Sequence, residues 1–180
     1  MVQLVVLSPL ARRSVLVAHV ACAVGWLGAA AAFLSLSIAG LRTHDEQTVQ
    51  AAYMAMDVII RFVLVPAALS GLVAGLVLAT GTPWGLFRHW WVLLKFLVTV
   101  PAAVILIGTL GTVSDLAHAH AAHTAGPVPA ALHDEGMHLL THAAGGLLVL
   151  LVPVALSVFK PFGRTPLAKH SRQREPSSAM

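Results

Sequence analysis

The sequence predicts an all-α, integral membrane protein built as a four-helix up-down-up-down bundle. Its composition is the first reason, because 58% of the 180 residues are hydrophobic and only 10% are charged, whereas soluble domains average about 25% charged residues. The second reason is that the apolar residues fall into long stretches, each of about 20 residues or more, the length that crosses a bilayer. The third is that these stretches are joined by short connections, as in an antiparallel helix bundle.

The expected transmembrane helices follow from the stretches poor in Asp, Glu, Lys and Arg. We place them at about 15–41, 58–79, 90–123 and 136–159. The first could instead be a cleaved signal peptide, but its apolar run exceeds the roughly 7–15 residues of a typical signal-peptide core, which favours an uncleaved helix.

The remaining segments are expected to connect or extend these helices. Residues 1–13 read as a short lead, and the polar residues 42–57 as a connection of which part may form a short interfacial helix. Residues 1–164 then make a single transmembrane domain, and the polar, basic residues 165–180 a disordered cytoplasmic tail.

Two features of the second helix bear on how it packs. Pro66 is expected to kink it, since proline is a common cause of helix kinks. Gly71 and Gly75 form a Gly-x-x-x-Gly face, which lets two helix backbones approach closely in a membrane.

Lys and Arg residues orient the bundle, because cytoplasmic connections carry an excess of them. With the N-terminus inside, the outer side holds only Arg42 and Arg61 of the 11 basic residues. We therefore expect a multi-pass protein of the inner (plasma) membrane, with both termini in the cytoplasm. The connection between the third and fourth helices then lies outside.

Composition also excludes several classes of protein. The net charge is +4, but the basic residues are spread between and after apolar stretches, so nucleic acid is not an expected partner. A single cysteine, Cys22, rules out an internal disulfide and a cysteine-based zinc cage. No phosphate-binding glycine loop and no hydrolase-like arrangement of serines are recognisable.

The outer mouth of the bundle is rich in histidine, since six of the 10 histidines lie between residues 118 and 146. Neutral imidazole binds haem iron, copper and zinc. Two histidines on neighbouring helices could clamp a haem from both faces, so His138 or His142 would pair with His118 or His120. Arg61, at the same mouth, could meet a haem propionate.

A bare metal ion is the alternative at this mouth. His138 and His142 are four residues apart and share one helix face, so they could bind copper or zinc with a further histidine, such as His118 or His120. A solvated, histidine-rich loop that binds metal only adventitiously is the simplest explanation for His120, His123 and His133. His142, about one turn inside the membrane, is more typical of a functional residue.

A second polar cluster is expected near the inner surface. His19, Cys22 and Trp26 fall on one stripe of the first helix, and Lys95 begins the third helix at a similar depth. His19 and Lys95 could face each other. Alternatively, Lys95 extends to the lipid headgroups and His19 only packs. In a bilayer core of about 30 Å this cluster lies on the order of 15 Å from His142, so the two cannot bind one ion.

Three short motifs resemble known membrane families. The pattern His19…Trp26-Leu27-Gly28 resembles the first helix of the HemJ-type protoporphyrinogen oxidases and of the CopD copper-resistance membrane domain. The pattern Trp91-x-x-x-Lys95 is similar to the same families, and the segment 155–166 is similar to a group of actinobacterial membrane proteins. The HemJ resemblance implies haem b bound by a four-helix protein, with His19 and Lys95 in the roles of its helix-one histidine and helix-three lysine. The CopD resemblance implies copper, which Met137 with the outer histidines would suit.

These observations favour a membrane redox protein that binds haem b, either an electron carrier or an oxidase acting on a porphyrin or a quinone. Its partners would be the lipid bilayer and a membrane redox partner or quinone, and several copies could assemble into a homo-oligomer. The alternative is a protein that binds or transports copper or another transition metal. A third hypothesis is a cofactor-free subunit of a membrane complex. The resemblance, rather than the residue spacing, favours the first.

Overall fold

The computed structural model describes residues 7–81, 89–122 and 130–159. These residues are helical almost throughout, and the elements are α1 (Pro9–Arg42), α2 (Glu46–Ile59), a π-helical turn η1 (Ile60–Leu64), α3 (Val65–Gly81), α4 (Trp90–Gly108), α5 (Leu110–Ala122) and α6 (Ala130–Phe159). Within the described part of the chain, four rods are long and apolar enough to cross a membrane. The predicted all-α fold and multi-pass membrane character are thus confirmed.

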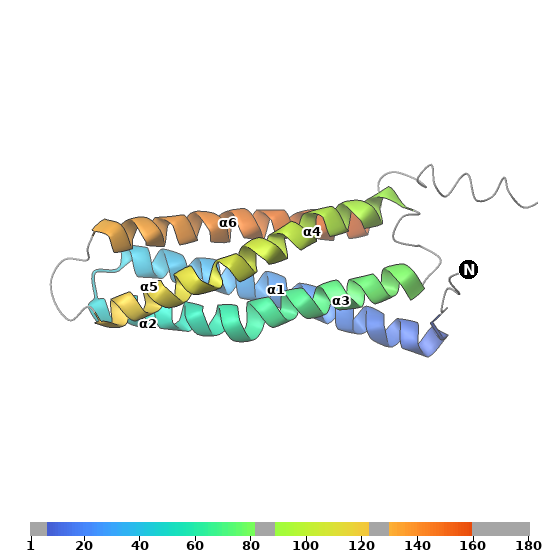
Figure 1. The fold of residues 1–180 in the computed structure, drawn as a ribbon, viewed down its shortest axis with the longest axis horizontal. Coiled ribbons are helices and arrows are strands. Elements are labelled where there is room, and N and C mark those ends of the chain that lie inside the picture. Colours follow the sequence, from blue (N-terminus) through green and yellow to red (C-terminus); the bar gives the residue numbers. More distant parts are fainter. Residues whose placement is uncertain (1–6, 82–88, 123–129, 160–180) are drawn as a thin grey trace, which may run out of the picture.

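The rods lie side by side along the long axis of the molecule (Figure 1). α1 packs against α2, α3 and α6, while α5 packs on α2 and α4 on α6. The end of α1, the start of α2, the end of α5 and the start of α6 gather at one end of the bundle, on the left in Figure 1. We call this the histidine-bearing end, because His118, His120, His133 and His138 belong to it.

The first helix begins earlier than expected, at Pro9 instead of residue 15. Ser8 precedes it, and its side-chain oxygen accepts a hydrogen bond from the backbone N–H of Ala11 at 3.3 Å. Proline suits the first helical position, because its missing N–H would have no partner there. The short lead expected over residues 1–13 is therefore helical from residue 9 onward.

The segment 42–57, expected to be a polar connection with a short helix in part of it, is helical from Glu46 onward, and this helix continues through η1 into α3. Asp45 caps this start by accepting a hydrogen bond from the Thr48 amide at 3.0 Å. The buried residues of α2 recur at the spacing of one helix face, and they are Val49, Ala52, Tyr53 and Met56. Burial of this apolar stripe against α1 and α5 stabilises the helix despite its polar outer face.

Irregular turns divide two of the rods. η1 ends two residues before Pro66, whose ring would clash in a regular helix with the carbonyl four residues earlier, that of Phe62 in η1. The wider π turn relieves that clash, so the expected disturbance at Pro66 takes this form. In the third rod, the predicted helix 90–123 is two helices that meet at Thr109, whose hydroxyl donates to the Leu106 carbonyl at 2.8 Å.

The fourth rod, α6, begins at Ala130, six residues before the expected start at residue 136. His133 therefore lies in a helix, although it was expected in a loop, and His120 lies in α5, within the helix expected over residues 90–123. His123 and the expected cytoplasmic tail over residues 165–180 lie outside the described residues.

The best-packed part of the core lies toward the histidine-bearing end. The side chains that are at most 1% exposed include Tyr53, Met56 and Ile60 on the second rod, and Val113, Leu116 and Ala117 on α5. The middle and opposite end instead leave many large apolar side chains uncovered, such as Val73, Leu97 and Val104. Such surface is favourable against lipid and costly in water, which agrees with a membrane location for that part of the bundle.

Candidate functional site

His120 is part of the packed core at the histidine-bearing end. Its ring stacks on that of Tyr53, with 4.4 Å between the centroids and 3° between the planes. The residue is only 7% exposed. Tyr53 in turn lies between two glycines, since a Cβ atom on Gly40 would be 3.2 Å from its ring and one on Gly136 2.5 Å from its hydroxyl. This setting assigns His120 a packing role between α5 and α2.

Arg61 and His118, both predicted from the sequence, are linked through Ser114. The Arg61 guanidinium donates to the Ser114 hydroxyl at 2.7 Å and to both carboxylate oxygens of Asp57 at 2.9 and 3.0 Å. His118 donates through Nδ1 to the Ser114 carbonyl at 2.7 Å. The arginine thus joins the second rod to α5. Its expected contact with a haem propionate stays a prediction.

His138 and His142 share a face of α6, as their spacing predicts, but they differ in setting. His138 is exposed. His142 donates through Nδ1 to the His138 backbone carbonyl at 2.8 Å. Because a carbonyl can only accept, this bond fixes the proton on Nδ1 and leaves a lone pair on Nε2 of the neutral ring.

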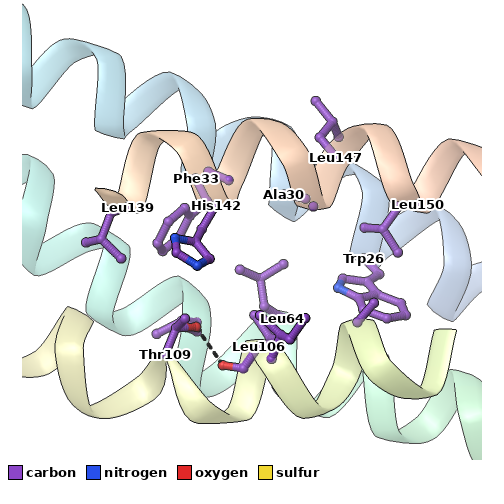
Figure 2. Close-up of a pocket in the computed structure, with 15 residues that line it drawn as sticks. Trp26, Ala30, Phe33, Leu64, Leu106, Thr109, Leu139, His142, Leu147 and Leu150 are labelled. Atoms are coloured by element: carbon purple, nitrogen blue, oxygen red, sulfur yellow. Dashed lines mark hydrogen bonds between the residues drawn. The ribbon is translucent and has the colours of Figure 1, made fainter. Parts of the chain in front are cut away.

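The His142 ring lines a cavity of about 90 Å³ inside the bundle. Figure 2 shows the ring directed from α6 into this space, with Phe33 of α1 beside it. The other walls are apolar apart from Thr109, and they come from all four rods; they include Trp26, Leu64, Leu106 and Leu139. The cavity is not fully enclosed. We call it the His142 cavity.

The predicted haem clamp between α5 and α6 would require histidines from the two helices to face one another. The structure instead places His120 against Tyr53, His118 beside Ser114 and His142 in its own cavity. Within the described ranges, no three His, Cys, Asp or Glu side chains lie close enough together to hold a metal ion. The copper and zinc hypotheses for this mouth therefore stay predictions.

At the opposite end, His19 of α1 packs on the glycine face of α3. Its Nδ1 donates to the Gly71 carbonyl at 3.0 Å. A Cβ atom on Gly75 would lie 3.2 Å from the His19 ring and 3.7 Å from the Phe96 ring of α4. Gly71 also faces α1, since a Cβ atom there would lie 3.6 Å from the Cys22 Cβ. The two glycines therefore pack against α1, as the Gly-x-x-x-Gly pattern predicts.

Lys95 of α4 neighbours this cluster. Its ammonium lies 4.9 Å from the centroid of the Trp91 ring, a favourable cation–π distance. Phe96, the residue after Lys95, lies with His19 against Gly75 of α3. The structure therefore brings His19 and the helical turn that carries Lys95 to the same level of α3.

Two residues that matter in these sites escaped the sequence analysis. Tyr53 was not singled out, although it lies on the apolar stripe of α2 and is the only tyrosine in the chain. Ser114 gave no local signal, because its role depends on the guanidinium that arrives from another rod.

Comparisons of the chain with protein-family models, with curated proteins and with solved structures found no match. The resemblance of its short motifs to the HemJ and CopD families therefore stays a prediction from the sequence.

Proposed function

We propose that this protein is a membrane redox protein that binds haem b at the site formed by His19 and Lys95. The observation that carries the proposal is that His19 of α1 and Phe96 of α4, the residue next to Lys95, both lie against Gly75 of α3, although they are far apart in the sequence. Polar groups inside a membrane are costly and usually serve a task. Their residue types also match the pair implied by the HemJ resemblance.

The chemistry of His19 suits an iron ligand. Its Nδ1 proton is held by the Gly71 carbonyl, an arrangement that orients ligand histidines and leaves Nε2 for the metal. Haem b, when bound, supplies one-electron chemistry. The chain would contribute the imidazole and the Lys95 charge near the site.

The proposal includes the orientation of the bundle. We place the rods in up-down-up-down order with both termini in the cytoplasm, in the plasma membrane. The basic residues support this orientation, because only Arg42 and Arg61 would then lie on the outer side. The His19–Lys95 pair would be near the cytoplasmic surface and the histidine-bearing end outside.

An absorption spectrum of the detergent-purified protein, first oxidised and then reduced with dithionite, tests the haem. We expect a strong Soret band and reduced α and β bands in the wild type, loss of these bands in His19→Ala, and shifted or weakened bands in Lys95→Met. His142→Ala is the matched control, and it should keep the wild-type spectrum. A featureless visible spectrum of wild-type protein made in haem-replete cells contradicts the proposal. Loss of haem in His142→Ala but not in His19→Ala would indicate that the haem binds at the outer mouth, which would also contradict the proposal.

A further inference from the structure

We propose that the His142 cavity binds the hydroxyl-bearing edge of a lipid-soluble quinol, whose ring hydroxyl donates a hydrogen bond to Nε2 of His142. This site goes beyond the proposed haem site and does not rest on it. Phe33, beside His142, lies about 21 Å along α1 from His19 at a rise of 1.5 Å per residue. The two sites are therefore separate places in the bundle.

The acceptor is a lone pair that the described residues leave without a partner. Nδ1 of His142 carries the proton, because it donates to the His138 carbonyl. Thr109, the other polar side chain of the lining, donates its hydroxyl proton to the Leu106 carbonyl. The His142 residue is exposed, so in a membrane its surroundings are the apolar lining of the cavity and lipid. A polar group in apolar surroundings is costly unless it is hydrogen-bonded, so a ligand that brings a hydroxyl donor to Nε2 would be stabilised there.

The size of the cavity selects against a large ligand. Its volume is about 90 Å³, whereas a buried apolar cavity that holds one benzene molecule measures about 150 Å³. A porphyrin, with four pyrrole rings, does not fit this space. The edge of a single ring does, provided that the rest of the molecule remains in the open side of the cavity.

The walls and the opening fit an aromatic ring with an apolar tail. Trp26 and Phe33 offer ring surfaces inside the cavity, and aromatic rings pack favourably on one another in offset or edge-to-face geometry. Ile105 belongs to the lining yet is 57% exposed, and Val104 and Leu148 nearby on α4 and α6 are also exposed. In a membrane this surface faces lipid, which is where a quinol and its tail reside.

Two neighbouring glycines of α6 allow a matched test. Gly146 lines the cavity and Gly145, on the exposed side of the helix, does not. A Cβ atom at either position would have no atom within 4 Å, so both accept a side chain. Gly146→Leu should fill the cavity, whereas Gly145→Leu should leave it open.

The measurement is equilibrium binding of radiolabelled decylubiquinol, kept reduced under nitrogen, to the protein in lipid nanodiscs, with the signal of empty nanodiscs subtracted. Wild type and Gly145→Leu should bind with the same Kd. Gly146→Leu and His142→Leu should each weaken binding at least tenfold. Decylubiquinone, which lacks the hydroxyl donor, should bind the wild type more weakly than the quinol does.

Wild-type affinity in Gly146→Leu, or equal losses in Gly145→Leu and Gly146→Leu, would overturn the proposal. If His142→Leu fails to fold, the glycine pair still decides the outcome. His19→Ala separates this inference from the haem proposal, because quinol binding should survive in a protein that has lost its haem. Absence of haem from the wild type would contradict only the haem proposal.

Discussion

At the level of single residues, Tyr53 holds the histidine-bearing end together. It belongs to α2 and contacts Gly40 of α1, Gly136 of α6 and His120 of α5. Each glycine leaves the space of one side chain, and the tyrosine fills both spaces. A phenol ring this well buried, at 1% exposure, can accept little extra volume, because protein interiors are close-packed.

This packing predicts that Gly136→Ala destabilises the protein by about 1–3 kcal/mol, the usual cost of overpacking a core. The new methyl group would lie 2.5 Å from the Tyr53 hydroxyl and 3.6 Å, an ordinary contact distance, from the ring carbon that bears it. It would also lie 3.0 Å from a terminal methyl group of Leu41, which can rotate away. Removing the hydroxyl should therefore relieve much of the strain. Unfolding in mixtures of detergent and sodium dodecyl sulfate should show a smaller cost of Gly136→Ala in a Tyr53→Phe background.

Gly40→Ala provides the control for this double-mutant cycle. Its methyl group would meet a ring carbon of Tyr53 at 3.2 Å instead of the hydroxyl, so Tyr53→Phe should not relieve it. Equal costs of Gly136→Ala in the two backgrounds would show that the hydroxyl is not the obstacle.

The histidines show what sequence can and cannot assign at this scale. His19, His118 and His142 each donate from Nδ1 to a backbone carbonyl and keep an acceptor on Nε2. The bonds of His118 and His142 join residues four apart in one helix, so the sequence spacing alone shows that they can form. The partner of His19 comes from another rod. Which acceptor faces a cavity depends on how the rods pack.

At the level of elements, α2 shows why the helical extent of the segment 42–57 was underestimated. Counting charged residues marked this segment as a polar connection. Its buried positions nevertheless repeat at helical spacing from Val49 to Met56, a signal that the count ignores. The helical spacing of the apolar residues would have predicted α2. That spacing does not show that α2 continues through η1 into α3.

The cap of α2 predicts a dependence on pH. Hydrogen bonds from the Thr48 hydroxyl and amide hold the pKa of Asp45 below its usual value. A lowered pKa in the folded state means that the cap stabilises the helix start fully above about pH 4, the ordinary pKa of Asp, and that this contribution is lost as the pH falls through the lowered pKa.

Hydrogen exchange of the first amides of α2, from Glu46 to Val49, measures this effect. Their protection in the wild type should decline on acidification below about pH 4. Asp45→Asn, a similarly good cap that does not titrate, should keep its protection, and comparison at equal pH removes the intrinsic dependence of exchange. The same decline in both proteins would rule out Asp45 as its cause.

At the level of the whole molecule, the rods are longer than a bilayer requires. Each contains 30 to 36 residues, or about 45–54 Å of helix at 1.5 Å per residue, against a hydrocarbon core of about 30 Å. Part of the bundle must therefore extend beyond the lipid. The well-packed histidine-bearing end, with Asp57, Arg61 and Asp115 on its rods, is the part suited to water.

Cysteine labelling tests this placement and the proposed orientation. In a Cys22→Ser background, which removes the only native cysteine, Gln50→Cys on α2 should react with a membrane-impermeant maleimide in intact cells. Thr80→Cys, at the other end of the same rod, should react only after lysis. Both side chains are exposed in the native protein. The reverse pattern of labelling would invert the bundle and place the histidine-bearing end in the cytoplasm.

The sequence by itself determined the helical class, the approximate spans and the two regions where polar chemistry lies, because these depend on local composition and spacing. Tertiary structure decided which of those residues meet. His120 became a core residue because Tyr53 arrives from α2, and Arg61 reached α5 through Ser114. The His142 cavity exists only where four rods leave a gap between their side chains. Such gaps arise from distant residues packing together, and no local pattern encodes them.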